Sequence, residues 1–416
     1  MKHLAPTLAV LACVAVPAMG AEDFSLKISG IVQARALLGN EGTNQDGDNY
    51  DPLRNQSGNA EYARFGVRRA RIAAAAKTSD GWFGNMTIRS GEPNNLSGSA
   101  DSSSPIALYY AYIGRTLKSG EIEHELKLGL DKSFNGESSI SSSTYLFPQD
   151  RVTASISDSV GSRAPGFSYR VNHEYVRVGV DVMNNTTTDG STMVSDNPST
   201  PANEAGRESG TRNGLRYSTR VEGGLLPAKK MESFAGAPGT HVVLGFEMAK
   251  NNDSFTAANT RVSTTIVGPD LMVHVDGLSF LAEYRARFID STAVNATNVA
   301  NDTTRNEARF WAIVAGYAIP TESGIVFEPA VRAQFADVHS AVGGTSAQKL
   351  AANGTNPAIT SHGEFNGAQS GKELGVSFNT YWNGHKNKTQ VAYTRAQAAE
   401  DQASASFFTI QQQITF

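Results

Sequence analysis

Cysteine is almost absent from this chain. The 416 residues include a single cysteine, Cys13, which lies in an apolar segment near the N-terminus. The rest of the chain can therefore form no disulfide bond and offers no thiolate ligand for a metal. A small disulfide-stapled secreted domain is excluded as well, because the chain is far too long for that class.

Long apolar runs are also missing. Lys2, an apolar run at residues 8–16 and the small residues around Met19 have the layout of a secretory signal peptide. We expect cleavage after Gly20 or Ala21, which makes residues 1–20 the signal peptide and residues 21–416 one domain. Lipid attachment at Cys13 is an alternative, which the very short apolar run before it disfavours. No later segment approaches the roughly 18 apolar residues that a membrane-spanning helix needs.

The chain also lacks an excess of basic residues and any recognisable catalytic motif. Lys and Arg number 36 against 40 Asp and Glu, so a general nucleic-acid binder is not expected. The chain has no His-Glu-x-x-His and no Gly-x-Ser-x-Gly, and residues 367–372 fall short of a phosphate-binding loop. We therefore expect no enzyme, no catalytic residue, no cofactor and no metal site. The acidic residues 46–51 could bind Ca²⁺, but the glycine and glutamate spacing of a calcium loop is not in register, and a solvated acidic loop is favoured.

Alternation of apolar and polar residues is what the sequence has in abundance. Val176, Val178 and Val180 alternate with Arg177 and Gly179, and the same pattern recurs at residues 124–131, 215–222, 280–288 and 374–382. A period of two is typical of β-strands with one face in an apolar medium and one in water. A sandwich can show it too, but it rarely places so many charges on the polar face of strand after strand.

Turns and loops alternate in length along the chain. Short turns, such as residues 79–81 and 276–277, alternate with long polar stretches. The long stretches are residues 39–62, 91–105, 132–165, 184–210, 290–306 and 339–369. Outer-membrane barrels combine short periplasmic turns with long extracellular loops in this way. The last strand alternates up to a terminal aromatic, Phe416, as outer-membrane barrels commonly do. We predict an all-β transmembrane antiparallel barrel of about 16 strands, with an unusually long connection at residues 223–239.

The charged residues on the polar strand faces would then line the lumen. Opposed charges across a water-filled pore set a transverse field, and rings of one sign filter ions. For any single residue, solubility and pairing between strands are sufficient explanations, so the set is more informative than its members. The predicted lumen-lining residues are Arg35, Lys127, Arg177, Arg216, Arg220, Arg285, Arg287, Arg332, Glu125 and Asp181.

Two segments resemble the phosphate-selective porin O and P family. Residues 65–72, Phe-Gly-Val-Arg-Arg-Ala-Arg-Ile, are similar to the arginine-rich second strand of that family. Residues 128–151 resemble its Gly-Gln-x-Lys-x-Pro stretch, serine pair and Phe-x-Glu-Arg motif. Gly129 and Lys132 match, whereas Leu130 replaces the glutamine, the proline is missing and one residue is added before Arg151. The resemblance implies a trimeric porin of about 16 strands with its third long loop folded inward, and it leaves phosphate as a candidate solute.

The third long loop, residues 132–165, contains apolar residues that an outward loop would expose: Tyr145, Leu146, Phe147, Val152 and Ile156. Folding it into the barrel would bury them against the wall and narrow the pore. The predicted constriction is Lys132, Arg151, Arg68, Arg69 and Arg89.

The sequence thus predicts an outer-membrane porin for passive diffusion of small hydrophilic solutes and ions, surrounded by outer-membrane lipid and with at most a mild preference for anions. The homotrimer is implied by the family resemblance alone. The alternative is a secreted or surface-attached all-β adhesin or binding module that uses the long loops.

Overall fold

The computed structural model describes most of the chain beyond the N-terminal segment. The described residues are 24–43, 49–51, 56–57, 61–90, 106–132, 146, 163–184, 215–227, 239–256, 260–294, 300–342, 371–398 and 404–416. The predicted signal peptide therefore lies outside the described residues.

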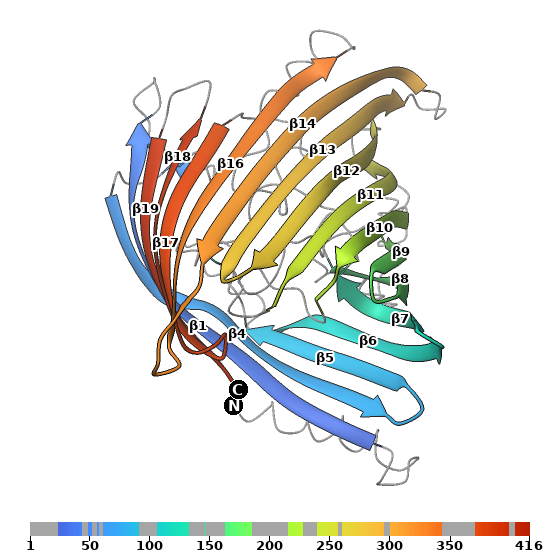
Figure 1. The fold of residues 1–416 in the computed structure, drawn as a ribbon. Coiled ribbons are helices and arrows are strands. Elements are labelled where there is room, and N and C mark those ends of the chain that lie inside the picture. The colour runs from blue at the N-terminus through green and yellow to red at the C-terminus, as the bar shows by residue number, and fades with distance from the viewer. Residues whose placement is uncertain are drawn as a thin grey trace.

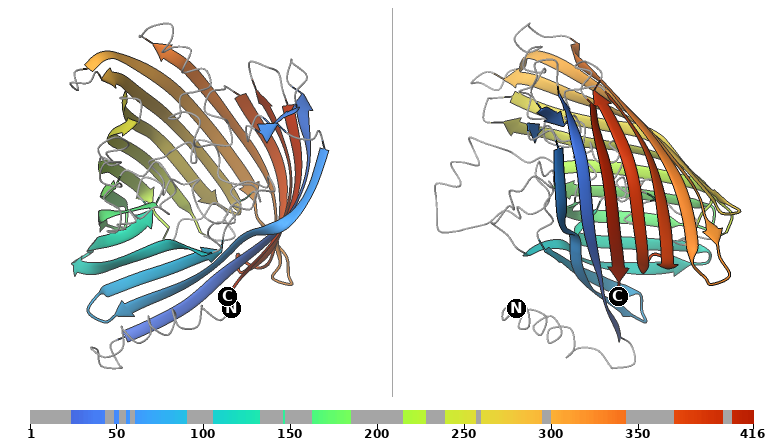
Figure 2. Two further views of the ribbon diagram at one scale, coloured as in Figure 1. Left: turned by 180° about the vertical axis from the view of Figure 1, so that it is seen from behind. Right: turned by 90° about the vertical axis from the view of Figure 1, so that its left-hand side faces the viewer.

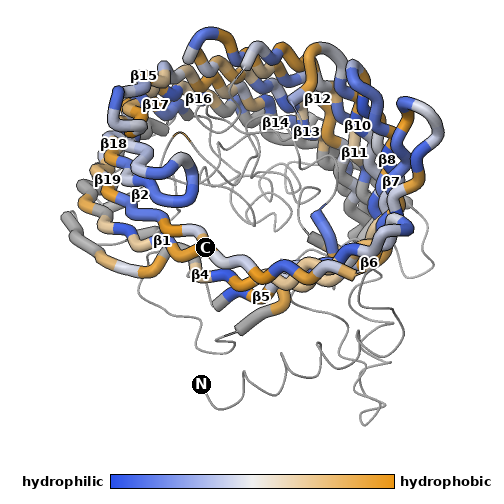
Figure 3. Tube along the Cα trace, turned by 60° about the horizontal axis from the view of Figure 1, so that its bottom comes forward, coloured by the Kyte–Doolittle hydropathy of each residue, from blue (hydrophilic) through white to orange (hydrophobic). Residues whose placement is uncertain are grey.

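The described residues form one closed antiparallel barrel of sixteen strands (Figure 1). Each strand pairs with its neighbours in the chain, and the first pairs with the last, which closes the ring seen in Figure 3. The further views show the strands inclined to the axis of the ring (Figure 2). The wall consists of β1 (Phe24–Thr43), β4 (Glu61–Thr78), β5 (Trp82–Ser90), β6 (Ile106–Ser119), β7 (Ile122–Lys132), β8 (Arg163–Asn172), β9 (Val176–Asn184), β10 (Leu215–Leu225), β11 (His241–Thr256), β12 (Thr260–Val275), β13 (Leu278–Val294), β14 (Ala300–Tyr317), β16 (Val326–Val342), β17 (Gly371–Asn383), β18 (Asn387–Ala398) and β19 (Ser404–Thr415).

Three short strands lie beside this wall. β2 (Asn49–Asp51) pairs with the end of β1 and with β3 (Gln56–Ser57). β15 (Ile319–Pro320) pairs with the start of β16. The acidic segment predicted as an alternative calcium loop, residues 46–51, thus lies partly in β2 and partly outside the described residues.

The C-terminal residue fastens the closing seam. Gly30 donates its N–H to the Phe416 carbonyl at 2.8 Å, and Phe416 returns a bond to the Gly30 carbonyl at 3.0 Å. The Phe416 ring lies over Gly30, where a Cβ would come 2.4 Å from ring atom Cζ. A side chain at position 30 would therefore displace the ring of the terminal aromatic.

Burial along the strands is the reverse of that in a soluble protein. On β17, Leu374 and Val376 are 51% and 55% exposed, whereas Glu373 and Asn379 are 1% and 0% exposed. The same alternation holds along β10, β11 and β16, so apolar side chains face outward and polar ones face the lumen. Only an apolar surrounding medium explains such an outer surface, because soluble proteins avoid large contiguous apolar patches.

The height of the apolar surface fits a bilayer. On the outer face of β17 it lies between two border residues, Lys372 at one end and Trp382 at the other, and the Trp382 indole N–H donates to Thr389 Oγ1 at 2.9 Å. Ten residues span about 33 Å along a strand, which is about 25 Å along the normal at a tilt of roughly 40°. A band of about 25 Å bordered by aromatic residues is typical of outer-membrane barrels.

One predicted loop is wrong in its extent. Residues 290–306 were expected to be a long polar loop, but β13 continues to Val294 and β14 begins at Ala300, with Asp290 opposite Arg305 and Thr292 opposite Thr303. Above the bilayer a strand needs no apolar face, so the alternation disappears while β-prone threonines and cross-strand pairs still support pairing. The long connection predicted at residues 223–239 is confirmed, since β10 ends at Leu225 and β11 begins at His241.

Candidate functional site in the barrel lumen

The inner face of the wall contains the residues that were predicted to line the lumen. Strand alternation places all of them on the face opposite to the exposed apolar side chains, and most are buried among one another and the described wall. Arg35, Lys127, Arg177, Arg216, Arg220, Arg285, Arg287, Arg332, Glu125 and Asp181 have this position. Their part in conduction stays a prediction.

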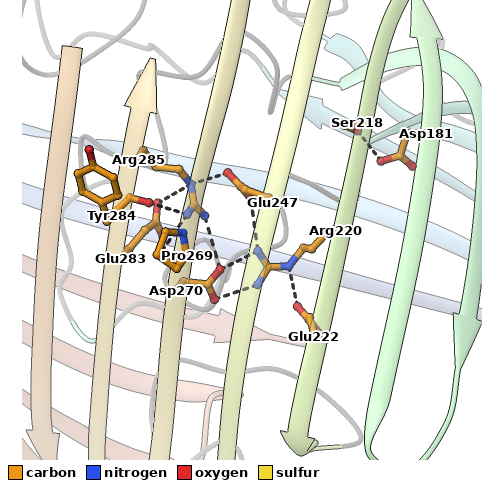
Figure 4. Close-up of polar contacts among 10 residues, drawn as sticks. All are labelled: Asp181, Ser218, Arg220, Glu222, Glu247, Pro269, Asp270, Glu283, Tyr284 and Arg285. Carbon is orange, nitrogen blue, oxygen red and sulfur yellow. Dashed lines mark hydrogen bonds and ion pairs between the residues drawn. The ribbon is translucent and has the colours of Figure 1, made fainter. Parts of the chain in front are cut away.

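An ion-pair network joins β10, β11 and β12 around Arg220 (Figure 4). The guanidinium binds Asp270 through two N–H groups, at 2.6 Å and 2.9 Å. It also binds Glu222 at 2.7 Å and Glu247 at 3.3 Å. A buried guanidinium that lost these carboxylates would carry a large desolvation penalty, so the four side chains form one unit.

Arg285 on β13 extends the network and also binds backbone carbonyl groups of the barrel wall (Figure 4). Its guanidinium forms an ion pair with Glu247 and lies 3.4 Å from Glu283. It further donates to the backbone carbonyls of Pro269 at 3.3 Å and Tyr284 at 2.9 Å. The sequence predicted Arg285 as a lumen charge, and its second role in holding the backbone was missed.

The reason for this second role is a break in the ladder between β12 and β13. The register runs to Val267 opposite Ala286 and resumes at Asp270 opposite Glu283. Pro269 has no N–H to donate, and a Cβ on Gly268 would lie 1.9 Å from the Tyr284 carbonyl oxygen. Inside a membrane a backbone group without a partner costs several kcal/mol, so a guanidinium at this position stabilises the wall.

A strip of amide side chains covers the inner face of β17, β18, β19 and β1. Arg35 donates to Gln411 Oε1 at 2.9 Å and 3.1 Å, and Gln411 donates to Gln390 at 3.3 Å. Gln390 donates in turn to Asn379 at 3.0 Å. These amides were missed as candidate lumen residues, although their positions on the polar faces of two alternating strands were a usable signal.

The inner wall of β4, β5 and β6 is strongly basic. Arg71 and Arg89 stand directly opposite each other on β4 and β5. The Arg71 Cζ atom lies 3.9 Å from the centre of the Tyr109 ring, and the Arg89 Cζ atom lies 5.3 Å from it. Arg89 was predicted for the constriction, whereas Arg71 and Tyr109 were missed.

The charge balance separates this wall from the one that carries the network. Strands β10 to β13 contain equal numbers of basic and acidic residues. Strands β4 to β6 lie across the ring from β12 and β13 (Figure 3) and are almost free of acids. Their charged residues are Arg64, Arg68, Arg69, Arg71, Lys77, Arg89, Arg115 and Lys118, against Glu61 alone. Of these, Arg115 lies over the outward-facing Trp82 ring and adds no charge to the lumen.

Leu146, between β7 and β8 in the chain, lies against the far inner wall. Its carbonyl accepts a hydrogen bond from Ser377 Oγ at 3.0 Å, and a Cβ on Gly316 would come 3.4 Å from its Cδ2 atom. Gly316, Ala330 and Ser377 are register neighbours on β14, β16 and β17, and we call these three small residues the Leu146 seat. Leu146 is completely buried there, across the ring from the strands that flank its loop (Figure 3).

The wall beside the Leu146 seat is apolar on its inner face as well. Met272, Leu281 and Val314 are neighbours in register on β12, β13 and β14 and are almost fully buried. A wall in contact with water alone gains nothing from such residues, whereas apolar residues of an inward segment can pack on them. One signal of this apolar inner wall was present in the sequence: residues 310–316 of β14 are apolar on both faces.

Comparison with solved structures finds outer-membrane channels. The outer membrane channel DcaP of Acinetobacter baumannii is similar over 95% of this chain and 99% of its own, at 14% identity and a TM-score of 0.58. An anion-selective porin from Comamonas acidovorans matches over 95% and 100%, at 10% identity and a TM-score of 0.55. The trimer form of OmpT, an outer membrane protein of Vibrio cholerae, matches over 95% and 100%, at 9% identity and a TM-score of 0.51.

This chain has the fold of an outer-membrane porin. Identities this low show the fold and nothing finer. No protein-family model matches the chain, and no curated protein matches it. The finer resemblance to the phosphate-selective porin O and P family is therefore not confirmed and stays a prediction.

The other predicted constriction residues are only partly described. Arg151 lies outside the described residues, and so do the side chains of Arg68 and Arg69. Lys132 ends β7 and is buried, but strand alternation gives it the face of Leu128, not the lumen face of Lys127 and Asp131. Among the predicted constriction residues, Arg89 is thus the one whose side chain is seen in the lumen.

In the described part of the chain, no group of three or more His, Cys, Asp or Glu side chains is arranged so that it could hold a metal ion. In the same residues no helix has the length and hydropathy to cross a membrane.

Proposed function

We propose that this protein is an outer-membrane porin through which small hydrophilic solutes and ions diffuse passively. The observation that carries the proposal is the reversed burial of a closed sixteen-stranded barrel, apolar outside and charged inside. Barrels of about 16 strands are wide enough to leave an aqueous channel, whereas barrels of about 8 are filled by side chains. A soluble adhesin would not tolerate the outer surface, which argues against the secreted, soluble form of the alternative from the sequence.

The lumen charges support a mild preference for anions. A basic wall on β4 to β6 faces a wall on β10 to β13 whose charges balance, so the summed field attracts anions. The ion pairs around Arg220 keep that opposite wall from acting as a strong cation site. Phosphate remains one candidate solute on the sequence resemblance, and chloride is the probe for the preference itself.

The third long loop is the proposed constriction element. Support comes from Leu146, which sits in its seat on the opposite inner wall. Packing of the loop on Met272, Leu281 and Val314 would narrow the lumen on that side and leave the passage along the basic wall. Arg151 keeps its predicted place near the narrowing, while the strand alternation of Lys132 argues against a lumen role for that residue.

A cleaved signal peptide at residues 1–20, residence in the outer membrane and a trimeric state complete the proposal. The outer-membrane location is supported by the exposed apolar band. The trimer is supported by the trimer form of a similar fold, OmpT.

Reconstitution into planar lipid bilayers tests the function. The heat-modifiable, folded protein should insert as discrete conductance steps that scale linearly with KCl concentration, as a water-filled pore requires. Recovery of the native chain as a soluble monomer without detergent would remove the proposal.

A further inference from the structure

We propose that Arg71, Arg89 and the tyrosines of β6 form a binding station for anions whose carboxylate is attached to a planar aromatic ring. The inference rests on the proposed porin function and names a solute class for it. We call Arg71, Arg89, Tyr109, Tyr110 and Tyr112 the arginine–tyrosine strip.

The first argument is the direct opposition of two like charges. Arg71 and Arg89 are cross-strand partners, and like charges in that position destabilise a sheet. Arg71 lies 3.9 Å above the Tyr109 ring and Arg89 lies 5.3 Å from it, so the negative ring face offsets part of the repulsion. Two guanidinium groups beside one ring offer enough N–H donors for both oxygens of one carboxylate.

The second argument is a β-bulge that adds an aromatic ring to the lumen. Between β5 and β6 the register steps from Thr87 opposite Tyr110 to Ile88 opposite Leu108, so Tyr109 is the extra residue. Leu108 and Ile88 keep their places on the outer face. The bulge therefore leaves the membrane surface intact and re-aims one tyrosine toward the arginine pair, a use of bulges that is common beside functional sites.

The third argument is the continuity of aromatic rings along the wall. Ring centres of Tyr109 and Tyr110 are 4.8 Å apart, and those of Tyr110 and Tyr112 are 6.4 Å apart, both pairs edge to face. Phe83 continues the series, 6.3 Å from Tyr112. Tyr110 and Tyr112 are partly exposed, so a planar solute has part of each ring to pack on.

Two guanidinium groups, those of Arg71 and Arg89, lie at the Tyr109 end of the strip. Lys127 lies 5.0 Å from the Tyr112 ring, but its ammonium group is 3.2 Å from both Glu125 and Asp131, which neutralise it. A bound aromatic carboxylate would thus direct its charge toward Arg71 and Arg89 and its ring toward Tyr110 and Tyr112. Inorganic phosphate would use the arginines without the rings, and a neutral sugar would use the rings without the arginines.

Competition in single-channel recordings tests the station. Benzoate is compared with cyclohexanecarboxylate, which has the same charge and a puckered, non-aromatic ring, and with inorganic phosphate. In the unaltered protein benzoate should reduce the chloride current with an apparent Kd about 3- to 10-fold lower than that of cyclohexanecarboxylate. Isothermal titration of the detergent-solubilised protein with benzoate supplies a measure of binding that does not depend on conduction.

Variants assign the binding to the strip. Arg71→Gln should weaken benzoate and phosphate alike, by about tenfold. Tyr110→Leu should abolish the difference between benzoate and cyclohexanecarboxylate and leave phosphate unchanged. Tyr217→Leu removes an outward-facing tyrosine of β10 and serves as the matched control, with all apparent Kd values unchanged. Heat-modifiable migration confirms folding, and Tyr112→Leu replaces Tyr110→Leu if the latter does not fold.

Equal apparent Kd values for benzoate and cyclohexanecarboxylate in a conducting channel would overturn the station and leave the porin function intact. The same holds if Arg71→Gln or the tyrosine variants bind benzoate as the unaltered protein does. Failure of the folded protein to conduct KCl would overturn the porin function, and calorimetry would then decide the station by itself.

Discussion

Removal of the Leu146 side chain should release the third long loop from the far wall. In Leu146→Ala the apolar contacts in the Leu146 seat are lost, whereas the backbone carbonyl that binds Ser377 remains. Burial of a leucine side chain is worth about 2–3 kcal/mol, so the docking equilibrium should shift roughly 30- to 150-fold. We expect a higher mean single-channel conductance and a noisier open level.

A reciprocal change in the seat should give the same phenotype. A Cβ on Gly316 already comes 3.3 Å from the Ala330 Cβ and 3.4 Å from Leu146 Cδ2, so Gly316→Val leaves no room for the leucine. The double variant should be no worse than either single one, because both remove one interaction. Leu374→Ala, on the outer face of β17, is the matched control with normal conductance. Unchanged conductance and noise in folded Leu146→Ala would refute the docking of this loop.

Three further outcomes are expected. Leu128→Arg places a charge on the outer face and should lower the free energy of unfolding by about 2–4 kcal/mol in urea titrations in lipid, while Lys127→Arg on the lumen face is near neutral. Arg220→Ala leaves Glu222, Glu247 and Asp270 without their shared cation and should cost roughly 3–5 kcal/mol in the same titration; a stability equal to that of the unaltered protein would mean that the lumen hydrates the network. Native mass measurement in mild detergent should find trimers, and a population of monomers alone would remove that part of the proposal.

The barrel could be predicted from the sequence because its cause is local. A strand between lipid and water must alternate, and residues such as Val176, Arg177 and Val178 show the alternation directly. Alternation is required only within the bilayer. The sequence therefore predicts a loop at residues 290–306, although β13 and β14 extend through most of them.

The details of the site could be predicted only in part. Alternation identified the inner faces and therefore Arg220 and Arg285, but the contacts between them depend on register between strands. Arg285 binds the backbone where Gly268 and Pro269, on the neighbouring strand, interrupt the backbone hydrogen bonds between β12 and β13. Tyr109 was missed because a bulge breaks the period of two at that residue, and a one-residue insertion leaves no mark in the pattern.

The seat of Leu146 could not be predicted at all. Apolar residues in the third long loop indicated an inward fold, and Leu146 was among them. Its partners Gly316, Ala330 and Ser377 are small residues on three strands far along the chain, and nothing local marks them as a receptor. Closure of the barrel brings them together.

The reversal potential across a planar bilayer, measured with a tenfold KCl gradient, tests whether this barrel is a water-filled channel that prefers anions. The account predicts discrete, ohmic conductance steps and a nonzero potential with the sign of chloride permeation, because the basic wall on β4 to β6 has no acidic counterpart of equal strength. A folded, heat-modifiable protein that produces no conductance steps would contradict the claim that this barrel is a water-filled channel. Steps with a cation-selective potential would contradict the charge account of its lumen.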